Sequence, residues 1–197
     1  MRRSERRRET RETRIVAELV VDGGGQAEVR TGIGFFDHML ATWARHGLFD
    51  LRLEADGDLH VDAHHTVEDV GLVLGAAWAE ALGDKRGLMR FGEATVPMDE
   101  ALVRAVVDLS GRPYFHDGVR LPPDQPRLGE WDVALLREFW RAFVTEARLT
   151  LHLDRLRGRN AHHLTEAAFK ATARALRVAA APDPRAGDAV PSTKGVL

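Results

Sequence analysis

The chain of 197 residues contains no cysteine. Disulfides, thiolate metal sites and cysteine nucleophiles are therefore excluded, and any metal ion must be bound by nitrogen and oxygen atoms. The sequence also lacks an apolar run of about 18 or more residues, and its N-terminus lacks the basic-then-apolar pattern of a secretory signal. We therefore expect no membrane span and no export, and the cytoplasm is the expected location.

An excess of charge of one sign is also missing. Lysine and arginine total 28 and aspartate and glutamate total 30, which gives a net charge of -2 with both signs mixed along the chain. We therefore expect no nucleic-acid partner, because a basic face would have to come from a local patch. The one such patch is residues 1–14, and Glu5, Glu9 and Glu12 interrupt it. This favours a solvated, partly disordered arm over a nucleic-acid-binding arm.

The hydrophobic content of 44% is enough for a core, in one domain or in two joined half-domains. Apolar periodicity and turn residues divide residues 14–83 into four predicted segments. They are a β-hairpin around "DGGG" over 14–33, a helix over 35–47 ended by Gly47, two strands joined at "DGD" over 48–62, and a helix over 64–83 ended by Gly83.

The same order of elements recurs later in the chain. We predict strands over 94–118, a Pro-rich loop over 121–130, an amphipathic helix over 131–147, a strand and turn over 148–158, and a closing helix over 160–179. A shift of 98 residues places Leu51 and Leu53 on Leu149 and Leu151. The expected fold is α+β, with an internal duplication of two similar sheet-and-helix half-domains packed together. The predicted parts are an arm (1–14), a first half (15–92), a second half (93–180) and a tail (181–197).

The same shift superposes two copies of a histidine doublet followed by a glutamate. The copies are "HHTVE", with His64, His65 and Glu68, and "HHLTE", with His162, His163 and Glu166. Residues three or four apart share a helix face, whereas adjacent residues point about 100° apart. Each doublet should therefore provide ligands to two different ions, and each ion should receive ligands from both halves, within a chain or across subunits.

Imidazole and carboxylate ligands without sulfur suit Mn, Fe, Zn, Co or Ni. A lone histidine is more often a hydrogen-bonded structural residue than a ligand. Two doublets at corresponding repeat positions favour metal binding instead. The remaining histidines are ambiguous on this evidence: His38, His46, His60, His116 and His152.

The tail "PSTKGVL" has two possible interpretations. Spacing alone favours an ordinary chain end without a function. Ser192, Lys194 and the backbone N–H groups near Gly195 are nevertheless suited to bind a phosphate, together with arginines such as Arg90 and Arg112.

Several of these stretches in combination resemble the imidazoleglycerol-phosphate dehydratase family of histidine biosynthesis, in its monofunctional form. The resemblance covers about residues 8 to 197, which is nearly the whole chain. The stretches that carry it are "RETRET", "GIGFFDHML", "DAHHTVEDVGLVLG", "RFGEATVPMDEAL", "DLSGRPY", "RNAHHLTEAAFKATARAL" and "PSTKGVL".

The resemblance implies two Mn²⁺ ions per subunit and a reaction that removes water from imidazoleglycerol phosphate to give imidazoleacetol phosphate. It also implies trimers assembled into a shell of 24 subunits, with the metal sites between subunits. Motif positions imply one ligand set of His38, His65, Glu68 and His163, and another of His64, His152, His162 and Glu166.

Further roles follow from the same resemblance. The proton that leaves the glycerol chain is not acidified by a carbonyl, so a ring deprotonated to imidazolate would expel hydroxide through a diazafulvene-like intermediate, with two cations stabilising the ring charge. Glu12 matches the family's acid/base glutamate, and Asp99 is a candidate for orienting the substrate. The phosphate would be held by Arg90, Arg112, Lys170, Ser192 and Lys194.

The chain departs from the family pattern at Ala41 and Thr42, which replace a common Asp-Gln pair after "DHML". A substrate or phosphate contact from that glutamine is therefore in doubt. Two alternatives to the dehydratase stay open on the residues. One is a dinuclear metallohydrolase, because the same ligands can activate water. The other is a non-catalytic metal-binding shell protein.

Overall fold

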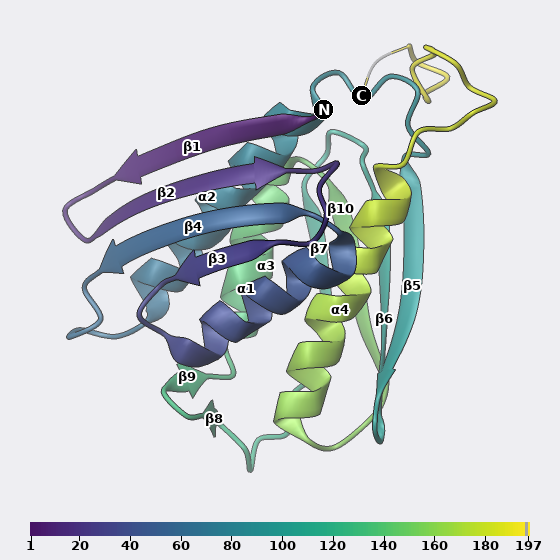
Figure 1. Cartoon of the computed structure of the whole chain (residues 1–197). Helices are drawn as coiled ribbons and strands as arrows, with labels where there is room; N and C mark the ends of the chain where they lie inside the picture. The colour runs from purple at the N-terminus through teal and green to yellow at the C-terminus, as the bar shows by residue number, and fades with distance from the viewer. Residues whose placement is uncertain (196) are drawn as a thin grey trace.

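The computed structural model describes residues 1–195 and 197, and they form two four-stranded sheets with four long helices (Figure 1). The first sheet has the order β1 (Arg3–Glu9), β2 (Thr13–Val20), β4 (Asp50–Gly57), β3 (Ala27–Arg30). The second has the order β5 (Phe91–Met98), β6 (Ala101–Asp108), β10 (Thr150–Arg157), β7 (Tyr114–Gly118). In each sheet the first three strands are antiparallel and the fourth runs parallel to its neighbour. This shared topology confirms the α+β fold and the internal duplication.

The helices join the two halves. They are α1 (Gly34–Gly47), α2 (His64–Leu82), α3 (Leu135–Ala147) and α4 (Ala161–Ala179). Helix α2 covers β1 and β2, and α4 covers β5 and β6. Across the halves, α1 packs on α4 and α2 packs on α3. Each motif helix therefore lies against the first helix of the other half.

Alternating burial places the core between the sheets and the helices. In β2 the buried residues are Ile15, Ala17 and Leu19, which is the period of two expected of a strand with one covered face. Four tryptophans are almost completely buried in one continuous core: Trp43, Trp78, Trp131 and Trp140.

The α2–α3 contact depends on glycine. A Cβ on Gly71 would lie 2.7 Å from the Phe139 carbonyl oxygen, and a Cβ on Gly75 would collide with the Phe143 carbonyl oxygen. The absence of side chains at these positions lets the two backbones approach closely. Within the described residues, no helix is both long and apolar enough to cross a bilayer.

The predicted helices over 64–83 and 160–179 are confirmed, and Gly83 caps α2 as expected. The helix over 35–47 is also confirmed, but its cap is Leu48 with φ of 57°, while Gly47 lies in the last helical turn. The helix predicted over 131–147 begins only at Leu135. Two short strands precede it, β8 (Arg127–Leu128), inside the predicted Pro-rich loop, and β9 (Trp131–Asp132).

Two strand predictions and one prediction of disorder are wrong. The hairpin over 14–33 does not form, because β4 lies between β2 and β3, and the Asp50 carboxylate binds the backbone N–H groups of Gly24 and Gln26 at 2.8 and 2.9 Å. The region 48–62 holds one strand, β4, followed by turns and loop. The N-terminal arm is solvated as expected but not disordered, since residues 3–9 form β1 along β2.

The number of residues that separates equivalent strand positions in the two halves also differs from the expected 98. Leu48 and Arg148 are equivalent left-handed caps, with φ of 57° and 51°, at the ends of α1 and α3. The strands that follow begin at Asp50 and Thr150, so a shift of 100 residues superposes them and Leu51 corresponds to Leu151. The helix motifs keep the shift of 98, because the loop before α4 is shorter than the loop before α2.

Candidate functional site

The second motif forms a compact cluster at the start of α4. The Glu166 Oε2 atom lies 3.2 Å from His162 Nε2 and 3.5 Å from His38 Nε2, which comes from α1 of the other half. The other carboxylate oxygen, Oε1, lies 2.7 Å from Lys170 Nζ. Burial alone would raise the pKa of the Glu166 carboxyl, but the hydrogen bond and charge of Lys170, together with His162 and His38, outweigh burial and lower it. One oxygen thus faces two imidazoles while a cation holds the other.

The first motif forms a matching cluster at the start of α2. His64, Glu68 and Glu138 each offer one ligand atom, and these atoms lie within 4.8 Å of one another. His64 Nε2 is 3.8 Å from Glu68 Oε2, and the guanidinium of Arg141 contacts Glu68 Oε1 at 3.3 Å and Glu138 at 2.7 Å. Here too a cation holds Oε1 and an imidazole faces Oε2.

The two clusters occupy equivalent places in the duplicated fold but differ in their contributions from α1 and α3. A shift of 100 residues places Glu138 at the position of His38, and Arg141 at the position of Ala41. The departure at Ala41 therefore lies near the second-motif cluster, and the neighbouring Thr42 is buried. The Glu166 cluster offers two imidazoles and one carboxylate, and the Glu68 cluster offers one imidazole and two carboxylates.

The second histidine of each doublet points away from its neighbour. The ring planes of His64 and His65 make an angle of 88°, and so do those of His162 and His163. His65 Nδ1 pairs with Asp58 at 3.0 Å, and His163 Nδ1 pairs with Glu100 at 2.7 Å. A carboxylate on Nδ1 favours the tautomer that leaves Nε2 free to bind a metal.

These imidazole–carboxylate pairs also shift the pKa values of their members. The hydrogen bond that Asp58 accepts from His65 raises the pKa of the His65 imidazole. The hydrogen bonds that the Glu100 carboxylate accepts from His163 and from the backbone N–H groups of Arg159 and Asn160 lower its pKa to about 2. Glu100 is therefore a stable acceptor that can orient the His163 ring.

His152 lies apart from both clusters. It sits on β10 between the buried residues Leu151 and Leu153, so its ring is on the opposite face of the sheet from the core. Its ring neighbours are Tyr114 at 5.5 Å and His116 at 5.3 Å. Within the described part of the chain, no polar contact joins His152 to either doublet.

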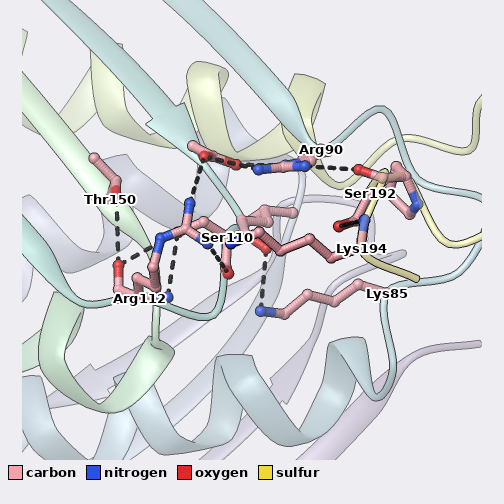
Figure 2. A network of polar contacts seen from close by, with 10 residues as sticks. Lys85, Arg90, Ser110, Arg112, Thr150, Ser192 and Lys194 are labelled. Carbon is pink, nitrogen blue, oxygen red and sulfur yellow. Dashed lines mark hydrogen bonds and ion pairs between the residues drawn. The ribbon is translucent and has the colours of Figure 1, made fainter. Parts of the chain in front are cut away.

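Four of the five residues predicted to bind phosphate lie together in a separate network (Figure 2). Arg90 pairs with Asp108 through Nε at 2.8 Å, and its Nη1 donates to the Pro191 carbonyl at 2.7 Å, which ties the tail to β5 and β6. Arg112 approaches the same Asp108 carboxylate at 3.9 Å. The side chain of Ser192 accepts a hydrogen bond from the Lys194 backbone N–H at 3.2 Å. The structure therefore gathers Arg90, Arg112, Ser192 and Lys194 in one place.

The three other predicted substrate contacts lie elsewhere. Lys170 is in the Glu166 cluster, and Asp99, in the turn between β5 and β6, is 3.6 Å from His163. Glu12 lies in the turn between β1 and β2, and its carboxylate is 3.8 Å from His65 Nδ1. All three are thus beside motif residues and not in the phosphate network.

The two groups of residues are at opposite ends of the helices. His162 is in the first turn of α4, whereas the Arg90 backbone N–H donates to Ala179, the last residue of α4, at 2.9 Å. Helix α4 has 19 residues, so it is about 28 Å long at roughly 1.5 Å per residue. Figure 1 shows the same separation, with both termini near the start of β5 and the β1–β2 turn far from them.

Sequence reasoning missed several residues that hold this arrangement. They are joined to the motifs by tertiary contacts that leave no periodic signal, although the shift of 100 residues that relates Glu138 to His38 offers a clue. The missed residues are Asp58, Lys85, Glu100, Asp108, Glu138 and Arg141.

Comparisons with known proteins match one enzyme family. The family model described as imidazoleglycerol-phosphate dehydratase matches residues 31–176. The dehydratase of Gluconacetobacter diazotrophicus is 58% identical over 96% of this chain and 95% of its own length, and that of Acidithiobacillus ferrooxidans is 56% identical over 100% and 98%.

Solved structures of the same enzyme share the fold. The crystal structure from Staphylococcus aureus has a TM-score of 0.81 at 40% identity and covers 90% of this chain and 97% of that one. The structure from Pyrococcus furiosus, in complex with (S)-C348, has a TM-score of 0.84 at 41% identity and covers 98% and 100%. The chain therefore belongs to the imidazoleglycerol-phosphate dehydratase family, the hydro-lyases of histidine biosynthesis.

Proposed function

We propose that this chain removes water from imidazoleglycerol phosphate with the help of two Mn²⁺ ions bound at the two motif clusters. The observation that carries the proposal is the pair of clusters at equivalent places in the duplicated fold. Each has a glutamate with one oxygen facing imidazole and the other held by a cation. Nitrogen and oxygen donors without sulfur suit manganese or a similar divalent ion.

The contacts favour a grouping of ligands that differs from the one implied by the resemblance. His162 and Glu166, and likewise His64 and Glu68, are four residues apart and face one another, so each pair suits one ion. His38 lies with the Glu166 pair and not with His65 and Glu68. His65, His163 and His152 then remain to complete sites formed with other subunits.

The separation of the clusters from the phosphate network supports a site shared between subunits. The imidazole ring and the phosphate of one substrate molecule are less than about 10 Å apart, given covalent bonds of about 1.5 Å. A helix about 28 Å long separates the two groups of residues within one chain. A substrate held at both ends must therefore contact two chains, and we propose a homo-oligomer, built from trimers into 24 subunits, in which metal binding promotes assembly.

The chemistry assigns distinct tasks to the side chains. His64, Glu68, His162 and Glu166 would hold the ions, and bound ions would supply Lewis-acid charge that stabilises the anionic form of the substrate's imidazole ring. Glu12, whose carboxylate lies beside His65, would remove the proton from the second glycerol carbon, the neighbour of the carbon attached to the ring. The hydroxyl on the carbon attached to the ring leaves as water, and the enol that remains tautomerises to the ketone of imidazoleacetol phosphate.

The phosphate end is bound by charge. Arg90 is fixed by Asp108, and Arg112, Ser192 and Lys194 lie around the same carboxylate and tail. Because guanidinium and ammonium groups donate charge-assisted hydrogen bonds, this network suits a phosphate dianion. We assign Lys170 to holding Glu166, and Asp99 to His163, where each is closest.

A coupled assay tests the proposal. Protein loaded with Mn²⁺ should convert imidazoleglycerol phosphate into imidazoleacetol phosphate, and removal of the metal by a chelator should abolish turnover and dissociate the assembly. No turnover by metal-loaded, assembled protein would rule out the dehydratase. Hydrolysis of the phosphate in the same assay, detected as free inorganic phosphate, would indicate the metallohydrolase instead.

A further inference from the structure

Lys85 is a buried lysine for which neither the motifs nor the proposed chemistry provides a role. It lies in the loop between α2 and β5 and is 8% exposed, whereas the next residue, Arg86, is exposed. Lysine is almost never buried this far without a partner. Its backbone has φ of 61°, a left-handed conformation that residues other than glycine adopt at a cost. The loop therefore holds the Lys85 side chain inward despite an unfavourable backbone.

The ammonium of Lys85 has few partners for its three donors. Its Nζ donates to the Leu109 carbonyl oxygen at 3.2 Å, and no carboxylate of the described residues is within ion-pair distance. Burial lowers the pKa of Lys85, the charge of Asp108 raises it, and the charges of Arg148 and Arg90 lower it again. A buried cation without a paired carboxylate is costly unless an anion is bound nearby.

The carbonyl that Lys85 binds belongs to the turn of the phosphate network. Leu109 donates its backbone N–H to the Arg90 carbonyl at 3.1 Å, and the following residue, Ser110, accepts from the Arg112 backbone N–H at 3.2 Å. Figure 2 shows Lys85, Ser110 and Arg112 within the same set of polar contacts as Arg90. Lys85 thus fixes the start of the turn that carries Arg112 and connects it to Arg90.

The charges of this region are also unbalanced. Lys85, Arg90, Arg112 and Lys194 gather near Asp108, which is the one carboxylate that pairs with this group among the described residues. Mutual repulsion among these cations would favour the binding of a dianion. The arrangement gives Lys85 two means of acting on a bound phosphate, through the turn and through its charge.

We propose that Lys85 is a positioning residue of the phosphate site, which holds the turn of Ser110 and Arg112 through the Leu109 carbonyl and places a fixed positive charge behind it. The proposal rests on the proposed function, because it assumes that the network binds the substrate phosphate. Lys85 itself does not contact the reacting atoms. It should therefore affect substrate binding and leave the chemical step nearly unchanged.

Three substitutions separate the two contributions. Lys85→Met removes the hydrogen bond and the charge, Lys85→Gln keeps a donor and removes the charge, and Lys85→Arg keeps both. Arg86→Met is the matched control, because it removes one positive charge from the adjacent exposed residue, which pairs with Asp84. Binding of inorganic phosphate to the assembled protein is measured by calorimetry, alongside KM and kcat for imidazoleglycerol phosphate, the melting temperature and the assembly state.

We expect Lys85→Met to weaken phosphate binding and to raise KM, each about tenfold, with kcat within about twofold of the unaltered protein. Lys85→Arg should restore most of the affinity, and Arg86→Met should leave it unchanged. Phosphate affinity retained in Lys85→Met, or lost equally in Arg86→Met, would overturn the proposal. Retained affinity in Lys85→Gln alone would overturn the charge contribution.

Two safeguards keep the result interpretable. If Lys85→Met fails to fold, Lys85→Gln takes its place, and equal affinity in Lys85→Gln and Lys85→Arg at matched melting temperatures would overturn the role of the charge. If the unaltered protein binds inorganic phosphate but does not convert the substrate, the dehydratase proposal fails while the test of Lys85 still stands.

Discussion

The two motif clusters have the same plan but different neighbours. At the start of α4 the Glu166 side chain is 10% exposed, is held by Lys170 of the same helix and faces His38 from α1. At the start of α2 the Glu68 side chain is 35% exposed, is held by Arg141 from α3 and faces His64, with Glu138 nearby. The duplication thus preserved the pair four residues apart, and the halves diverged in what α1 and α3 contribute. We expect the more buried Glu166 cluster to bind its ion more tightly.

The largest effects should come from the imidazoles. His162→Ala and His64→Ala should each remove one of two Mn²⁺ ions per chain, abolish measurable turnover and weaken assembly, because metal binding is coupled to folding and association. Metal analysis by mass spectrometry and the sedimentation profile measure these outcomes. Two ions per chain in either variant would show that the altered histidine is not a ligand.

The next effect concerns Glu12, which lies beside the first motif only. Glu12→Gln should retain both ions and substrate binding while kcat falls by about 10² to 10⁴, the usual range for loss of a general acid or base. Steady-state kinetics and substrate binding measured by calorimetry give the two readouts. Glu9→Gln, in the same arm and paired with Arg14, is the control. A kcat near normal in Glu12→Gln would exclude the acid/base role.

A smaller effect is expected from Arg141, which holds Glu68 as Lys170 holds Glu166. Arg141→Ala should weaken Mn²⁺ binding at the Glu68 cluster by about 10- to 100-fold, as expected for a residue that orients a ligand. Arg137→Ala on the same helix, where Arg137 is exposed, is the control. Competition with a metal-binding dye gives the two affinities separately. Equal loss at both clusters would show that Arg141 acts on the fold and not on Glu68.

The smallest effect concerns β1, the outer strand of the first sheet, whose counterpart in the second sheet is β5. Arg2 anchors β1 through Asp22, with Nε contacts of 3.2 and 3.1 Å, and these hydrogen bonds lower the pKa of Asp22 to about 2. Because the folded pKa is below the usual value of about 4, the stabilisation is complete above about pH 4 and is lost as the pH falls through about 2.

The pair is partly exposed, so its contribution should be below about 1 kcal/mol. Asp22→Asn should lower the free energy of unfolding by that amount at pH 6, measured by urea denaturation, and the difference from the unaltered protein should shrink as the pH falls from about 4 toward 2. A difference that is undiminished at pH 2 would show that the aspartate stabilises the strand in another way.

Local signals in the sequence predicted the helices and the repeat well. The doublets at a shift of 98 residues identified both motif helices, and apolar periodicity located α1, α2 and α4 closely. Strand pairing was harder, because the insertion of β4 between β2 and β3 depends on contacts between distant segments, such as Asp50 with the loop at Gly24. The expected partial disorder of the arm is wrong, because its charges indicate solvation but do not reveal the backbone pairing with β2 that orders residues 3–9.

Both the role of the motif residues as ligands and their grouping around two ions stay predictions. The resemblance implies that His38 shares an ion with His65, whereas within one chain the packing of α1 on α4 brings His38 to Glu166. Arg141 and Glu138 carry no motif, and only the contact of α3 with α2 brings them to Glu68. Asp58 and Glu100 likewise reach the doublets from loops. Contacts between distant segments of the chain determine these neighbours, and such contacts leave no local pattern in a single sequence.

We propose that the metal cluster of one chain and the phosphate network of another chain form one site. Coassembly of His162→Ala chains with Arg112→Ala chains tests it directly, since each variant alone should be inactive. In a random equal mixture we predict about one quarter of the unaltered turnover, because half of the chains supply an intact metal cluster and half an intact phosphate network. Turnover no higher than that of the separate variants, in assemblies shown by mass spectrometry to be mixed, would contradict the account.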